Sequence, residues 1–131
     1  MSTDPNHHIE IKSQLEEWAN YDSLTSIFNR RYGEHLLDTI QKDMCNEDNS
    51  CCVLLADIDC FKTINDTHGH ALGDKVLQQV MHELSKNLRS KDTLIRWGGD
   101  EILIVLPSIK LDSALKMADR LRTVIESCKF P

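Results

Sequence analysis

Two short segments of β-forming residues, 93–97 and 102–106, are separated by only four residues of the chain. The connecting segment, Gly98-Gly99-Asp100-Glu101, begins with two glycines, which can supply the positive φ angles that a tight turn requires. This pattern predicts a β-hairpin with two acidic residues at its tip. A continuous apolar run at 51–56, ending at Asp57, is typical of a central strand buried on both faces. We expect this strand and the hairpin to form one small sheet.

Helices are expected around these strands. A helical lead-in is expected over 9–21, followed by a turn at 22–25. Asn29 is expected to cap a helix whose apolar residues recur every four positions: Tyr32, Leu36, Ile40 and Met44. A strongly amphipathic helix is expected to bury Val76, Leu77, Val80, Met81, Leu84 and Leu88. A last helix is expected to be capped by Asp112 or Ser113. Its apolar residues are expected to face the core: Leu115, Ala118, Leu121, Val124 and Ile125.

The predicted order is therefore helix, strand, helix, strand, strand, helix. It indicates an α+β sandwich with helices on one side of the sheet, similar to a ferredoxin-like fold that lacks its last strand. Residues 1–20 are expected to form the lead-in, and 21–131 one domain. This is consistent with a length of 131 residues, a common size for a single domain.

Composition excludes several classes of function. The 15 basic and 21 acidic residues give a net charge of −6, which disfavours a nucleic acid polymer as partner. No apolar run approaches the roughly 20 residues needed to span a bilayer, and no signal peptide is visible. Five cysteines at irregular spacing indicate reduced thiols in a cytoplasmic protein.

Acidic residues are expected to gather at one edge of the sheet. Asp57 and Asp59 follow the apolar strand, and Asp100 and Glu101 lie at the hairpin tip. Four neighbouring carboxylates repel one another unless they share a cation, and such hard oxygen ligands suit Mg²⁺ or Mn²⁺. The alternative is that these side chains are simply solvated at a strand end and a turn.

The polar segment after Asp57 has residues suited to binding a nucleotide. Backbone N–H groups after the strand and the positive charge of Lys62 can hold phosphate. Asn65 and Asp74 can recognise a purine edge, although Asp74 can equally stabilise the start of a helix. The spacing of His68 and His70 favours turn residues over a metal site, because no third soft ligand lies near.

Four segments in order resemble the signatures of GGDEF-domain diguanylate cyclases. They are residues 22–31 (DSLTSIFNRR), 57–66 (DIDCFKTIND), 69–74 (GHALGD) and 96–101 (RWGGDE). The resemblance covers about residues 20–128 and implies a sheet like the palm of nucleotidyl cyclases. It also implies that two GTP molecules are joined into cyclic di-GMP by a Mg²⁺-dependent homodimer.

The resemblance assigns roles to residues at matching positions. Asp57, Asp100 and the Ile58 carbonyl would hold Mg²⁺, while Asn65 and Asp74 would recognise guanine. Asp100 or Glu101 would assist deprotonation of the attacking 3′-hydroxyl. The contacts to ribose and phosphates would come from His70, Lys62 and the amides around Cys60 and Phe61.

Arg89 and Asp92 resemble the RxxD inhibitory site of the family, through which the product would restrain the enzyme. The alternative is an arginine at a helix end beside a loop aspartate. Two residues depart mildly from the family pattern: Ile102 stands where the family usually has phenylalanine, and Ser26 stands where it usually has glycine. A larger departure is that the family's domain continues past residue 128 through a further strand and helix, so we expect a C-terminally truncated domain. This leaves open an inactive module that binds cyclic di-GMP, or one that pairs with another chain through the lead-in helix or an open sheet edge.

Overall fold

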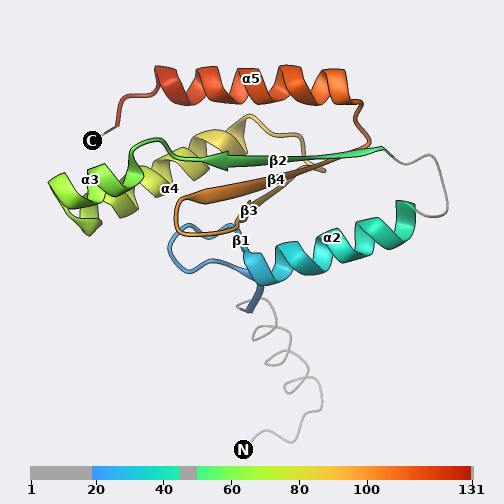
Figure 1. Ribbon diagram of the computed structural model, residues 1–131, viewed down its shortest axis with the longest axis horizontal. Helices are drawn as coiled ribbons and strands as arrows, with labels where there is room; N and C mark the ends of the chain where they lie inside the picture. Colours follow the sequence, from blue (N-terminus) through green and yellow to red (C-terminus); the bar gives the residue numbers. More distant parts are fainter. Residues whose placement is uncertain (1–18, 45–49, 131) are drawn as a thin grey trace, which may run out of the picture.

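The computed structural model describes residues 19–44 and 50–130, and its centre is a four-stranded sheet (Figure 1). Along the sheet the strands have the order β1-β3-β4-β2. The strands are β1 (Phe28–Asn29), β2 (Cys51–Asp57), β3 (Thr93–Arg96) and β4 (Glu101–Pro107). The helices are α2 (Arg30–Met44), α3 (Phe61–His68), α4 (His70–Lys86) and α5 (Leu111–Ser127). The α+β fold is confirmed; most of the predicted lead-in helix lies outside the described residues.

The predicted hairpin is confirmed, and its register places the acidic residues. β3 and β4 are antiparallel, with Arg96 opposite Ile102. β4 is also antiparallel to β2, and Asp57 at the end of β2 lies opposite Glu101. The prediction of positive φ angles at Gly98 and Gly99 is wrong, because Gly69 is the described glycine that adopts one. An added Cβ would approach the Glu101 side chain at Gly98, but nothing within 4 Å at Gly99.

Helices cover both faces of the sheet, which corrects the expectation of helices on one side. Alternate residues of β4 divide between the two faces. Ile102, Ile104 and Leu106 pack with the buried side chains of α4 and α5. Leu103 and Val105 pack with Leu36, Leu37 and Ile40 of α2, on the opposite face. As predicted, Asn29 caps α2: its Oδ1 accepts a hydrogen bond from the Tyr32 amide at 3.0 Å.

Strand β2 is at an edge of the described sheet, so the prediction of a central strand buried on both faces is wrong. Val53 and Leu55 are 45% and 65% exposed. The apolar run resembles a central strand because every residue from Cys51 to Ala56 is apolar, on both the solvent side and the core side.

Two helices also differ from expectation. The polar segment after β2 forms α3, which begins after Cys60 in the left-handed region at φ 60°. On α5 the buried residues are Ala114, Met117 and Leu121, while Leu115 is 58% exposed rather than inward. Lys110, not Asp112 or Ser113, occupies the N-cap position, without a side-chain cap. Among the described helices, none is both long and apolar enough to cross a membrane.

Candidate active site

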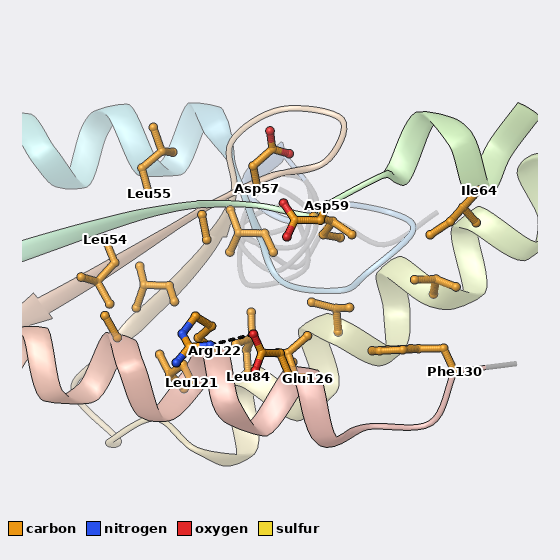
Figure 2. A pocket seen from close by; sticks show the side chains of 18 of the residues that line it. Leu54, Leu55, Asp57, Asp59, Ile64, Leu84, Leu121, Arg122, Glu126 and Phe130 are labelled. Atoms are coloured by element: carbon orange, nitrogen blue, oxygen red, sulfur yellow. Dashed lines mark hydrogen bonds and ion pairs between the residues drawn. The ribbon is translucent and has the colours of Figure 1, made fainter.

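Two carboxylates meet where β2 ends beside the hairpin tip. The Ile58 N–H donates to the Asp100 carbonyl at 3.2 Å, which fixes the end of β2 against the turn. A hydrogen bond with Asp100 raises the pKa of the Asp57 carboxyl, and desolvation and the charges of Asp100 and Glu101 act in the same direction. In Figure 2, Asp57 and Leu55 project from the face of β2 opposite to Leu54, away from α5. The two aspartates thus form an electrostatically strained pair on the α2 side of the sheet.

The pair has the chemistry of a divalent cation site. Oxygen ligands from two carboxylates and a carbonyl suit a small hard cation, which completes its coordination with water or substrate phosphate. The expected cluster of four carboxylates is not formed: across residues 19–44 and 50–130, no three His, Cys, Asp or Glu side chains converge as a metal site. Asp57 and Asp100 remain together, with the Ile58 carbonyl nearby in sequence.

The segment predicted to bind phosphates lies at the start of α3. Cys60 and Lys62 are exposed there. The Phe61 N–H, by contrast, donates to the Ile58 carbonyl at 3.3 Å. That long hydrogen bond involves both a predicted phosphate donor and a predicted metal ligand, so the two groups satisfy each other in this arrangement.

The turn at Gly69 places the Asn65 side chain of α3 against Gly73 of α4, the residue before Asp74. The Gly69 N–H donates to the Asn65 carbonyl at 2.8 Å and ends α3, and α4 begins at His70. The Asn65 Oδ1 is buried and accepts no hydrogen bond from the described part of the chain. Such an unpaired acceptor suits a ligand with N–H donors, as the guanine edge has. His68 and His70 flank the turn and are exposed.

Arg89 and Asp92 form a rigid pair away from these carboxylates. Arg89 Nη2 donates to Asp92 Oδ1 at 2.7 Å and to the Pro107 carbonyl at 2.9 Å, and the Arg89 amide donates to Asp92 Oδ2 at 2.7 Å. The hydrogen bond to Asp92 raises the pKa of Arg89. The Asp92 side chain is fully buried and that of Arg89 is one-third exposed.

A shallow cavity of about 340 Å³ adjoins Arg89 and contains two cations that the sequence interpretation missed. They are Lys116 and Arg120 of α5. Their spacing of four residues places them on one helix face, and this spacing is the sequence signal that could have revealed them. With Arg89 they give this cavity a positive lining suited to an anion.

A larger cavity of about 680 Å³ lies between β2 and the helices α4 and α5 (Figure 2). Its lining is mainly apolar, with Leu54, Leu84 and Leu121 among its residues. The Arg122–Glu126 ion pair, at 2.7 Å, is its main charged feature on α5. The cavity lies mainly on the α4 and α5 side of the sheet. Asp57, Ile58 and Asp59 are among its lining residues, although the Asp57 carboxylate projects to the other side of the sheet, so the cavity adjoins the candidate cation site at the end of β2 (Figure 2).

Comparison with known proteins identifies the family of this chain. Residues 19–131 match the family described as "Diguanylate cyclase, GGDEF domain". The response regulator PleD of Caulobacter vibrioides is 40% identical over 87% of this chain, and diguanylate cyclase DgcM of Escherichia coli is 36% identical over 88%. The chain spans only 25% and 28% of these two relatives.

A solved structure of the coiled coil and GGDEF domain of DgcB from Caulobacter crescentus, in complex with c-di-GMP, superposes with a TM-score of 0.84. It is 25% identical, and the match covers 88% of this chain and 61% of that one. The chain is therefore a member of the GGDEF-domain family of diguanylate cyclases.

Proposed function

We propose that the protein is a diguanylate cyclase that joins two GTP molecules into cyclic di-GMP as a homodimer. The observation that carries this proposal is the strained Asp57–Asp100 pair beside the hairpin tip. A triphosphate with a divalent cation is the ligand that resolves such strain. Asn65 on α3 packs against Gly73 of α4, the residue before Asp74, and its unpaired Oδ1 supports guanine as the base.

In the proposed reaction each chain holds one GTP, and the two sites face each other. Asn65 and Asp74 bind the guanine edge, and His70, Lys62 and the amides around Cys60 and Phe61 lie along the ribose and phosphates. Bound at Asp57, Asp100 and the Ile58 carbonyl, Mg²⁺ or Mn²⁺ would neutralise triphosphate charge. Asp100 or Glu101 takes the 3′-hydroxyl proton as the 3′-oxygen forms a bond to the α-phosphorus of the other GTP and pyrophosphate leaves. A second transfer closes the ring.

The direct test is incubation of the protein with GTP and Mg²⁺, followed by chromatography for cyclic di-GMP and pyrophosphate. Product from the wild-type chain, with none from Asp100→Asn, is the expected result. If GTP is not consumed by a folded wild-type protein, this chain is not itself an active cyclase.

We further propose that Arg89, Asp92, Lys116 and Arg120 bind the product and inhibit the enzyme. In titration calorimetry, Arg89→Ala is expected to weaken cyclic di-GMP binding by about 10-fold or more, because a charge-assisted contact is lost. A matched control is Arg122→Ala, which removes an exposed α5 arginine outside this cavity. Equal affinity of the Arg89→Ala and Arg122→Ala proteins would contradict the inhibitory site.

The exposed β2 edge favours a second candidate function, an inactive module that pairs with another chain. Leu55→Lys is expected to reduce concentration-dependent self-association, because a lysine on an edge strand opposes strand pairing. Leu111→Lys is the control, since Leu111 is also 65% exposed but lies on α5. Sedimentation velocity over a range of concentrations measures the effect. Equal association of both variants and the wild type would exclude pairing through β2.

A further inference from the structure

Trp97 follows β3 directly and lies in one row of the sheet with two of the proposed active-site carboxylates. Its N–H donates to the Glu101 carbonyl at 2.9 Å, which extends the pairing of β3 with β4 by one residue. Glu101 in turn lies opposite Asp57 of β2. Opposite residues of antiparallel strands share a face of the sheet, so these three side chains lie on one face. Trp97 packs with Leu103 on the α2 side, which is also the side to which Asp57 projects (Figure 2).

The first turns of α2 hold the Trp97 indole from two directions. Arg30 Cζ lies 4.5 Å from the ring centroid, which is the arrangement of a cation–π contact. Arg30 is itself paired with Glu34, whose Oε1 lies 3.0 Å from its Nε. Gly33 is buried, and a Cβ there would lie 3.2 Å from Trp97 Cζ3 and 3.0 Å from Ile95 Cγ2. A glycine at this position therefore allows α2 to approach the ring closely.

The position of the Glu101 carboxylate depends on the side chains around it, because Glu101 is exposed. A Cβ at Gly98 would lie 3.2 Å from Glu101 Cδ, so the carboxyl group lies over the glycine turn. Asp57 is its neighbour in β2, and two like charges so close repel each other. On the other side lies the Trp97 indole, since opposite residues have Cβ atoms about 5 Å apart. The ring therefore blocks the direction in which this repulsion would move Glu101.

We propose that Trp97 is a positioning residue, which confines the Glu101 carboxylate beside Asp57. Arg30 and Gly33 fix the ring for this role. This inference rests on the proposed cyclase function, in which Asp100 or Glu101 takes the 3′-hydroxyl proton. Trp97 does not touch the reacting groups and acts through Glu101. An indole suits the role because it is a large, rigid body that loses little conformational freedom when it is fixed.

Steady-state kinetics test the proposal by comparing Trp97→Leu and Trp97→Phe with Tyr32→Leu. The control removes a ring of α2 that stacks on Phe28, with centroids 4.0 Å apart. In Trp97→Leu we expect kcat to fall about 10-fold or more, because a reacting group is misplaced, while the KM for GTP stays within about twofold. Gly33→Ala, which displaces the ring, should give a loss of the same kind. Trp97→Phe should keep kcat within about threefold, because a flat ring remains beside Glu101.

Three kinetic results would overturn the proposal. The first is wild-type kcat in Trp97→Leu, and the second is a loss confined to KM. The third is an equal loss of kcat in Trp97→Leu and either Trp97→Phe or Tyr32→Leu, because the effect would then not depend on a ring beside Glu101.

A double-mutant cycle needs no activity, so it separates failure of this inference from failure of the proposed function. Chemical denaturation is measured for Trp97→Leu, Glu101→Gln and the double variant. Their effects on the unfolding equilibrium constant should depart from additivity by about threefold or more, because the two side chains are in contact. The cycle of Tyr32→Leu with Glu101→Gln should be additive. Additivity in the Trp97 cycle would overturn the inference even in an active cyclase, whereas coupling in a chain that makes no product would contradict only the cyclase function.

Discussion

Asp100→Asn is expected to abolish cyclic di-GMP formation and, at the same time, to raise the melting temperature of the metal-free protein. The loss of turnover should be about 100-fold or more, because a charged group at the reaction centre is removed. The gain in stability follows from the Asp57–Asp100 pair, in which the hydrogen bond and charge of Asp100 raise the pKa of Asp57. Scanning calorimetry and the chromatographic assay measure the two effects on the same samples.

The gain in melting temperature should depend on pH in a defined direction. The folded-state pKa of Asp57 lies above its ordinary value of 3.8, so the folded state binds this proton more tightly than the unfolded state. The loss of folding stability caused by ionising Asp57 beside Asp100 is therefore absent below pH 3.8. It grows as the pH rises through the raised pKa and is complete at neutral pH. Asp59→Asn, nearby on the same loop, is the matched control and should not raise the melting temperature. A gain that persists in acid would contradict this origin.

The sequence predicted the hairpin and the helices α2 and α4 because their signals are local. Paired glycines between apolar runs, and apolar residues at helical spacing, need no knowledge of distant contacts. The position of β2 could not be predicted in the same way. Leu55 faces solvent and Leu54 faces the core, yet both are leucine, so no polar residue marks the exposed face.

The same contrast between local signals and long-range contacts applies to the candidate site. Asp57 and Asp100 were predicted together because the ends of neighbouring strands meet at one edge of the sheet. An ion pair between Asp22 and Arg96 joins residues 74 positions apart, and no periodic pattern indicates it. Helix α3 was missed because it is short and carries no buried residue to form an apolar stripe. Long-range polar contacts and short exposed helices are what the sequence pattern leaves undetermined.

Gly73→Ala is expected to disrupt the proposed guanine site from inside a helix. A Cβ at this position would overlap Asn65 Oδ1 and lie 2.9 Å from Asn65 Cγ, so the Asn65 side chain must move. Alanine is favoured over glycine within a helix by about 1 kcal/mol, but overpacking typically costs about 1–3 kcal/mol. We expect the steric term to dominate, giving a net loss of about 1 kcal/mol in the free energy of unfolding. Chemical denaturation measures it.

Gly99→Ala is the matched control for stability, because a Cβ there meets nothing within 4 Å. The double variant Asn65→Ala/Gly73→Ala separates packing from recognition. Removing the Asn65 amide relieves the overlap, so the double variant should be more stable than Gly73→Ala alone. Its KM for GTP should nevertheless remain as high as that of Asn65→Ala, since the group proposed to bind guanine is gone. If the double variant regains wild-type KM, Asn65 does not recognise the base, and the orphaned Oδ1 beside Gly73 is only a packing feature.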